Sequence, residues 1–204
     1  MRVVVPFDAD APKTRLAPLF DDAERAALAR VMLTDVLAAL RDAAEEPTVL
    51  ATADVDCEAP VEVDERPLTA AVNAVLESAD GAVAVVMADL PLLNESCLDR
   101  FFATSAGVAL APGRAAGTNA LVCRHPDFRV DYHGTSFLDH LSIADGVGAS
   151  VDVVDSFRLA TDVDERADLV EVMVHGEGTR SHDWLHDLGV ELTIEGGRVG
   201  VRRP

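Results

Sequence analysis

Lysine is almost missing from this sequence of 204 residues, and positive charge in general is scarce. Of 17 basic residues all but Lys13 are arginines, while 36 Asp and Glu residues give a formal net charge of -19 at pH 7. A nucleic-acid-binding surface needs clustered cations that neutralise a run of phosphates, and the sequence holds no such cluster. We therefore expect no nucleic-acid partner, whereas a small anionic ligand in a local cationic pocket fits this composition.

Cysteine is scarce as well, and long apolar runs are missing. Cys57, Cys97 and Cys123 are odd in number and lack the spacing of metal ligands. No signal peptide and no apolar run of transmembrane length stands at either end. We expect a cytoplasmic protein with reduced thiols and no membrane partner.

Several motifs with known chemistry are also absent. There is no G-x-S-x-G elbow and no G-x-x-x-x-G-K-[ST] loop, so serine hydrolases and P-loop NTPases find no support. The histidines suggest zinc, but no cysteine joins them at the usual spacings, and we do not expect a zinc site. The histidines considered are His133, His140, His175, His182 and His186.

The order of apolar segments predicts one α/β domain over residues 1–204. Apolar β-branched runs alternate with segments of helical periodicity, which predicts a mostly parallel mixed sheet flanked by helices. The predicted strands are 2–6, 48–51, 61–63, 82–86, 108–111, 119–124 and 151–154, and the predicted helices are 21–44, 67–78, 95–102, 135–144 and 164–174. For residues 176–204, the sequence pattern predicts a short helix and a hairpin that form a C-terminal appendage to this domain. A ligand of such a sheet binds outside the carboxyl ends of the strands.

Lys13 lies on the loop that follows the first predicted strand. This turn-rich loop carries Lys13 and Arg15 before a helix begins. Loops of this kind hold phosphate when their amides and the next helix N-terminus face the anion and an ammonium adds a point charge. The alternative is a solvated surface lysine, and this segment alone does not decide between the two.

Carboxylates follow two later segments. Asp89 stands at the carboxyl end of the predicted strand 82–86, where it can hold Mg²⁺ or begin a turn. Asp164 is expected to cap the predicted helix 164–174, which leaves Asp162 free to reach a metal ion held by Asp89.

Two segments of small and polar residues supply candidate anion contacts. Residues 113–121 form a loop of small residues that runs into a strand, so its backbone amides can approach an anion closely. Residues 132–140 place hydroxyls and amides at a helix start, which suits a phosphate or carboxylate. Thr135 or Ser136 can instead serve as a simple N-cap.

Taken together, five segments resemble the CofC family, the 2-phospho-L-lactate guanylyltransferases of coenzyme F420 biosynthesis. They are Val-Val-Val-Pro at 3–6, Pro-Lys-Thr-Arg-Leu at 12–16, Met-Leu-Thr-Asp-Val-Leu at 32–37, Ala-Asp-Leu-Pro-Leu at 88–92 and Gly-Thr-Asn-Ala-Leu at 117–121. The resemblance covers residues 1–175, and the acidic composition is similar to that of haloarchaeal proteins. It implies a Rossmann-like, nucleotide-diphospho-sugar-transferase (GT-A-like) fold, a Mg²⁺-dependent reaction and a homodimer.

The resemblance also implies the reaction and the site. GTP and 2-phospho-L-lactate would give lactyl-2-diphospho-5'-guanosine and pyrophosphate. Lys13 and Arg15 would hold the triphosphate, and Asp89 and Asp162 would position Mg²⁺. The other implied contacts are Pro6, Thr69 and Asn73 for the nucleotide, and Thr118, His133, Gly134 and Ser136 for the acceptor.

Two alternatives stay open. A related nucleotidyltransferase could use phosphoenolpyruvate, which differs from phospholactate only around the carbon that bears the phosphate. A non-catalytic nucleotide-binding regulatory module is the alternative from another class. The presence of Lys13, Arg15 and Asp89 argues against such a module, because binding alone needs no metal carboxylate.

Overall fold

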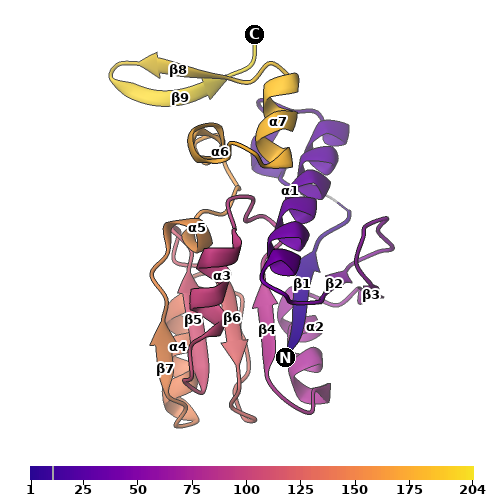
Figure 1. The fold of residues 1–204 in the computed structure, drawn as a ribbon, viewed down its shortest axis with the longest axis vertical. Coiled ribbons are helices and arrows are strands. Elements are labelled where there is room, and N and C mark those ends of the chain that lie inside the picture. Colours follow the sequence, from indigo (N-terminus) through magenta and orange to yellow (C-terminus); the bar gives the residue numbers. More distant parts are fainter. Residues whose placement is uncertain (11) are drawn as a thin grey trace.

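A computed structural model of the chain, which describes residues 1–10 and 12–204, contains a seven-stranded sheet with helices on both faces (Figure 1). In spatial order the strands are β3 (Val61–Val63), β2 (Pro47–Ala51), β1 (Arg2–Phe7), β4 (Val83–Val86), β6 (Thr118–Cys123), β5 (Val108–Pro112) and β7 (Val151–Val153). β6 is antiparallel to both neighbours, and the other neighbouring pairs are parallel. The prediction of a mostly parallel mixed sheet is confirmed. Within the described ranges, no helix is both long and apolar enough to cross a membrane.

The central strands are apolar on both sides because helices cover both faces of the sheet. The first layer consists of α1 (Asp22–Asp42) and α3 (Glu95–Phe102), and the second of α2 (Leu68–Ser78) and α4 (Ser136–Gly146). Val3 and Val5 of β1 pack in the cluster with α1 and α3, whereas Val4 packs with α2 and α4. This alternation follows from the two-residue period of a strand. Each such buried side chain contributes about 1.5–3 kcal/mol of hydrophobic stabilisation.

The strands β1 and β4 separate near their carboxyl ends. The register of β1 against β4 ends at Val4, while β1 continues along β2 as far as Phe7. Pro6 lies in this last stretch, where a missing N–H breaks no bond to β4. A crevice is therefore expected between the two strand ends.

A third apolar cluster joins α1 to the C-terminal part of the chain. The elements there are α6 (Leu169–His175), α7 (Arg180–Asp187), β8 (Glu191–Glu195) and β9 (Arg198–Arg202). Leu28 and Met32 of α1 pack in one cluster with Val172, Leu185 and Val201. Figure 1 shows α7 beside α1, with the hairpin β8–β9 at the end of the molecule that carries the C-terminus. The predicted C-terminal helix and hairpin are both present.

The segment before α6 differs from the prediction of a helix over 164–174. A short helix, α5 (Phe157–Ala160), precedes it, and α6 begins only after Asp168. The carboxylate Oδ2 of Asp168 accepts hydrogen bonds from the backbone N–H groups of Asp164 and Glu165. These bonds close a turn, so residues 164–168 do not join the helix.

The helix predicted over 21–44 forms as α1, and a short turn precedes it after Lys13. A single 3-10 turn, η1 (Thr14–Leu16), follows Lys13, and α1 starts after Asp21. The Asp21 carboxylate accepts from the N–H of Glu24, and the Glu24 carboxylate accepts from the N–H of Asp21. Such an acidic first turn favours the helix dipole but repels an anion. The first turn of α1 is therefore unfavourable for an anion, and the predicted phosphate contact of this loop depends on Lys13 and Arg15.

Candidate active site

A cleft of about 580 Å³ opens at the carboxyl ends of β1 and β4. Its walls come from the end of β1 with the loop that follows, from the segment that leads into α2, and from the residues that follow β4. The lining side chains include Pro6, Lys13, Arg66, Met87 and Asp89. Small-molecule sites usually measure about 300–1,000 Å³, so the cleft is large enough for a ligand of nucleotide size.

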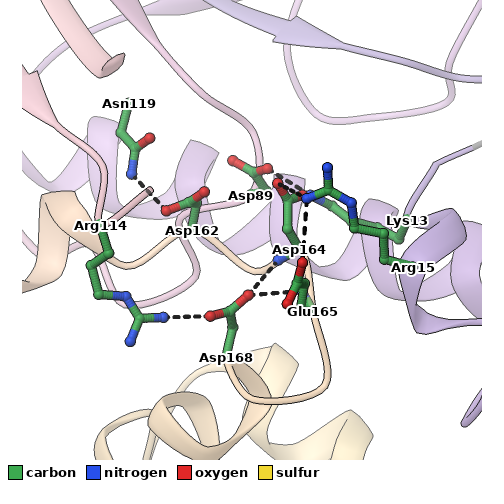
Figure 2. A network of polar contacts seen from close by, with 9 residues as sticks. All are labelled: Lys13, Arg15, Asp89, Arg114, Asn119, Asp162, Asp164, Glu165 and Asp168. Carbon is green, nitrogen blue, oxygen red and sulfur yellow. Dashed lines mark hydrogen bonds and ion pairs between the residues drawn. The ribbon is translucent and has the colours of Figure 1, made fainter. Parts of the chain in front are cut away.

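Lys13 lies at the cleft with an unusual backbone and a buried ammonium. Its φ and ψ of 57° and 40° are left-handed. Its Nζ lies 2.6 Å from Oδ2 of Asp89 and 2.8 Å from Oδ1 of Asp164 (Figure 2), and the side chain is 11% exposed. Burial by itself lowers the pKa of Lys13, but the two carboxylates outweigh it and raise the pKa above its ordinary value. The surface-lysine alternative does not describe this residue.

Asp164 differs from its prediction as a helix cap. Its carboxylate faces the ammonium of Lys13, and α6 starts only after Asp168. Asp168 fixes the turn, because its Oδ1 accepts a hydrogen bond from the Arg114 guanidinium at 2.6 Å and its Oδ2 accepts from the Asp164 N–H (Figure 2). The cap prediction is wrong, and Asp164 belongs with the carboxylates around the ammonium.

Arg15 lies farther out than Lys13. It is part of η1, and its side chain is 67% exposed. Its guanidinium lies 3.6 Å from Glu165 and 4.0 Å from Asp164 (Figure 2). Ion pairs this exposed contribute little to stability. The Arg15 guanidinium is therefore an exposed cation beside the carboxylates of Asp164 and Glu165.

Asp162 lies beside Asp89, although it comes from a distant segment (Figure 2). The backbone N–H of Val163 donates to the carbonyl oxygen of Asp89 at 3.1 Å, which ties the two segments together. Burial raises the pKa of Asp162, a hydrogen bond from Asn119 lowers it, and the charge of Asp89 raises it again, with a net value above the ordinary one. A nearby cation would relieve this unfavourable charge.

The carboxylates fit a magnesium ion only together with a ligand. Among the residues that the structure describes, no group of three or more His, Cys, Asp or Glu side chains forms a ready metal site. Mg²⁺ is usually bound through one or two carboxylates, substrate phosphates and water. The oxygen donors of Asp89 and Asp162 match that chemistry when a nucleotide supplies the remaining ligands.

Asn119 positions Asp162, a role that the sequence analysis missed. Its Nδ2 donates to Oδ1 of Asp162 at 3.1 Å and to the carbonyl oxygen of Leu159 at 3.0 Å. A Cβ added at Gly113 would lie 2.5 Å from Oδ1 of Asn119, so only glycine leaves room for this amide. The close pairing of Gly113 with Asn119 could not be foreseen from their spacing.

Thr118 and Ser136 lie together, although they are 18 positions apart in the sequence. The N–H of Thr118 donates to Oγ of Ser136 at 3.0 Å, and both residues are buried. The N–H groups of His133 and Gly134 have no acceptor within the described part of the chain. Gly134 adopts φ 54°, which glycine tolerates. The four residues predicted for the acceptor thus form two adjoining groups of donors.

Three backbone N–H groups of the loop between β5 and β6 are already hydrogen-bonded within the fold. The N–H of Gly113 donates to the carbonyl oxygen of Gly117, and the N–H of Ala116 donates to that of Gly113. The N–H of Arg114 donates to the carbonyl oxygen of Ala160. Because these three groups are used within the fold, they are not free to contact an anion, and the prediction stays open for the other amides of residues 113–121.

Thr69 and Asn73 are placed differently from their predicted role at the nucleotide. Asn73 exchanges two hydrogen bonds with the backbone of Val130, and Oγ1 of Thr69 accepts from the N–H of Tyr132. Helix α2 instead turns other residues, Leu68 among them, toward the cleft. Thr69 and Asn73 therefore hold the segment that leads to the His133 turn, which corrects the prediction.

Curated proteins called 2-phospho-L-lactate guanylyltransferase are similar to this chain over its whole length. One from Halomicrobium mukohataei is 59% identical over 204 residues and covers 100% of both chains. One from Haloferax volcanii is 57% identical over 204 residues, covering 100% of this chain and 98% of the relative. One from Methanoregula boonei is 45% identical over 203 residues, covering 98% of this chain and 94% of the relative.

Solved structures share the fold at low sequence identity. A protein named nucleotide-diphospho-sugar transferase from Desulfovibrio desulfuricans has a TM-score of 0.74 and 14% identity, covering 92% of this chain and 95% of its own. The 2-C-methyl-D-erythritol 4-phosphate cytidylyltransferase from Thermus thermophilus has a TM-score of 0.56 and 20% identity, covering 87% and 98%. The predicted GT-A-like fold is confirmed. Residues 1–203 match the family described as guanylyl transferase CofC like, and the chain therefore belongs to the CofC family.

Proposed function

We propose that this chain transfers a guanylyl group from GTP to 2-phospho-L-lactate in coenzyme F420 biosynthesis. The products are lactyl-2-diphospho-5'-guanosine and pyrophosphate. Family membership and the names of the curated relatives support this activity. The observation that carries it is the Lys13 ammonium, held 2.6 Å from Asp89 and 2.8 Å from Asp164 at a nucleotide-sized cleft.

The reaction forms one P–O bond and breaks another. A phosphate oxygen of 2-phospho-L-lactate attacks the α-phosphorus of GTP, and the bond from that phosphorus to the α,β-bridging oxygen breaks. The electron pair of the broken bond leaves with pyrophosphate. Because the second pKa of a phosphate monoester is about 6, the acceptor is already anionic at neutral pH and needs no general base. The protein must align the phosphates and offset their repulsion.

Lys13 is suited to exchange one anionic partner for another. Its ammonium has three donors on a flexible stem, so it can keep one carboxylate and contact a phosphate oxygen at the same time. The neighbouring Arg15 adds a second cation from the exposed side. Together these two side chains would bind the triphosphate and stabilise charge on the leaving pyrophosphate.

Asp89 and Asp162 would hold Mg²⁺ against the α-phosphate. When bound, the ion polarises the phosphoryl oxygen and neutralises charge on the leaving group. Asn119 would fix the orientation of the Asp162 carboxylate through its hydrogen bond of 3.1 Å.

The acceptor would lie against Thr118, Ser136 and the His133–Gly134 turn. Two hydroxyls and two backbone N–H groups suit a phosphate or a carboxylate, because all four can donate. Pro6, at the end of β1, would form part of the nucleotide wall.

The test is acceptor-dependent release of phosphate by the purified protein in about 1 M KCl, where charge repulsion is screened. The mixture contains Mg²⁺, pyrophosphatase and either GTP or ATP, and receives 2-phospho-L-lactate or phosphoenolpyruvate. Release with GTP and 2-phospho-L-lactate alone supports the proposal. Release with phosphoenolpyruvate alone keeps the chemistry and changes the acceptor. No release with any pair, from protein shown to be folded, favours the regulatory module.

A homodimer is part of the same proposal. The hairpin β8–β9 exposes apolar side chains, with Leu192 44%, Ile194 78% and Val199 54% exposed. A contiguous apolar face of this kind is typical of a covered surface. Light scattering of the purified protein measures the mass directly, and a monomer of 21.6 kDa at micromolar concentration would refute the dimer.

A further inference from the structure

We propose that His140 is a positioning residue that turns the hydroxyl of Thr118 toward the anionic group of the acceptor. The inference deepens the proposed function and rests on it, because it concerns the acceptor side of the same site. In the sequence His140 stands out only as one of several histidines without a metal partner. The structure gives it a different set of contacts.

His140 lies one helical turn after Ser136 in α4 and is fully buried. Its ring packs against the rings of Tyr132 and Phe128, with centroids 5.1 Å and 6.0 Å away. It reaches two separate segments, since Nδ1 lies 2.8 Å from Oγ1 of Thr118 and Nε2 lies 3.0 Å from the backbone N of Asp131. The imidazole thus bridges the start of β6 and the segment that leads to the His133 turn.

The backbone N–H of Asp131 determines the protonation of the ring. A backbone N–H can only donate, so Nε2 must accept and carries no proton. A neutral imidazole then carries its single proton on Nδ1, which therefore donates to Oγ1 of Thr118. No other arrangement satisfies both contacts.

This arrangement leaves the hydroxyl proton of Thr118 available. Oγ1 already accepts from His140, and the structure gives that hydroxyl no acceptor within the described residues. Ser136 is in the same state, because its Oγ accepts from the N–H of Thr118. Two neighbouring hydroxyls are thus presented as donors, the arrangement that an oxyanion requires.

Burial keeps the ring in this neutral form. It lowers the pKa of His140 to about 4, against the opposing charges of Asp131 and Asp139. At neutral pH the ring therefore stays an acceptor at Nε2 and a donor at Nδ1.

Two substitutions at this one position separate the two contacts of the ring. In His140→Asn, the amide nitrogen takes the place of Nδ1 and keeps the donor to Thr118. In His140→Gln, the longer side chain places its carbonyl oxygen near Nε2, which keeps the acceptor for Asp131 but loses the donor to Thr118. The exposed His186 of α7 gives the matched control His186→Gln.

We expect His140→Gln to raise the KM for 2-phospho-L-lactate about tenfold, the value of one hydrogen bond of about 1.4 kcal/mol. His140→Asn should stay within about threefold of wild type, and the KM for GTP should stay unchanged in both variants. Equal effects of the two substitutions would overturn the inference, and a larger effect of His140→Asn would mean that His140 only anchors the Asp131 segment.

A double substitution tests whether His140 acts through the hydroxyl. In a Thr118→Val background, His140→Gln should cause no further rise in the acceptor KM, because the hydroxyl is already gone. A full additional tenfold rise would overturn the inference.

Two readouts do not depend on turnover. Imidazole ¹⁵N spectra should show His140 protonated at Nδ1, and a proton on Nε2 would overturn the inference. Calorimetric binding of 2-phospho-L-lactate should weaken in His140→Gln but not in His140→Asn. Wild-type protein that binds this acceptor without turnover refutes the proposed reaction alone, whereas protein that binds no acceptor refutes both.

Discussion

Lys13 carries its ammonium on a backbone that few side chains adopt. A non-glycine residue with φ 57° costs about 1 kcal/mol or more, and this strain coincides with a buried pair of ion contacts. Strained residues are often found at functional sites, where the surrounding structure holds them in place. The loop thus directs a compact cation toward Asp89 and Asp164 rather than toward solvent.

Replacing Lys13 with arginine keeps the charge but changes its shape. A guanidinium is a broad, planar fork, and the space between Asp89 and Asp164 fits an ammonium whose contacts are 2.6 Å and 2.8 Å long. We expect Lys13→Arg to lower kcat/KM at least about tenfold, with circular dichroism unchanged. Steady-state kinetics with GTP measures this. Wild-type kinetics would remove Lys13 from the mechanism.

Asp164 should matter for turnover and not only for the fold. Because its carboxylate contacts the Lys13 ammonium and is 47% exposed, we expect Asp164→Asn to lower kcat/KM by about tenfold while the melting temperature changes little. Asp89→Asn serves as the reference and should abolish magnesium-dependent turnover. The exposed Asp187 supplies the control Asp187→Asn. Full activity with a lower melting temperature in Asp164→Asn would return this residue to a structural role.

At the scale of elements, α1 holds the C-terminal part of the chain through one carboxylate. Oδ1 of Asp35 accepts from the N–H of Arg180, and Oδ2 accepts from both the N–H and the hydroxyl of Ser181, at 2.6–2.8 Å. These groups form the first turn of α7, so Asp35 acts as a helix cap from another helix. Apolar side chains of α1 and α7 also pack together in the third apolar cluster.

Removing this cap should loosen the C-terminal helix and hairpin. We expect Asp35→Ala to lower the free energy of unfolding by about 2–3 kcal/mol, because hydrogen bonds to a charged acceptor are lost and the donors of the buried Ser181 remain. Urea unfolding in high salt measures the change, with the exposed Asp99 of α3 as the control Asp99→Ala. A change no larger than that of the control would contradict the assignment.

The buried imidazole of His140, which links α4 to β6, should make the stability of the fold depend on pH. The folded pKa is about 4 and the ordinary value is 6.5, so between these values the unfolded chain binds a proton that the folded chain does not. Stability is therefore fully present above pH 6.5 and falls as the pH drops toward 4, by about 3 kcal/mol at 1.36 kcal/mol per pKa unit.

Urea unfolding of the wild type and of His140→Asn across this range isolates the contribution. Because carboxylates titrate in both proteins, the difference between the two stability curves reports the imidazole. The curves should converge as the pH falls from 6.5 to 4. Parallel curves would show that His140 has an ordinary pKa in the fold.

The whole molecule carries a net charge of -19, which should make its stability depend on salt. Repulsion among carboxylates opposes the compact state, and the screening length falls from about 10 Å at 0.1 M salt to about 3 Å at 1 M. We expect the melting temperature to rise steeply over this range of KCl. Sucrose, which does not screen charge, is the control, and a melting temperature independent of KCl would contradict the prediction.

The strands, most helices and the fold class could be predicted from the sequence because they depend on local patterns. The run that became β4 is apolar at every position, which indicates a strand buried on both faces. The family followed from short motifs read together, and the match over residues 1–203 confirms it. Lys13 and Asp89 also stood out locally, because each follows a strand whose carboxyl end faces the crevice.

Only the tertiary structure decided how distant side chains pair. Asp164 resembles a helix cap in its local sequence, yet the turn held by Asp168 sends its carboxylate to Lys13, 151 positions away. The family resemblance implies that Asn73 contacts the nucleotide, but its side-chain amide is hydrogen-bonded to the backbone of Val130. The orientation of the Thr118 hydroxyl depends on His140 in the same way. Local patterns determine which elements form, whereas the partner of a buried polar group depends on which elements meet, and that is set by packing the whole chain.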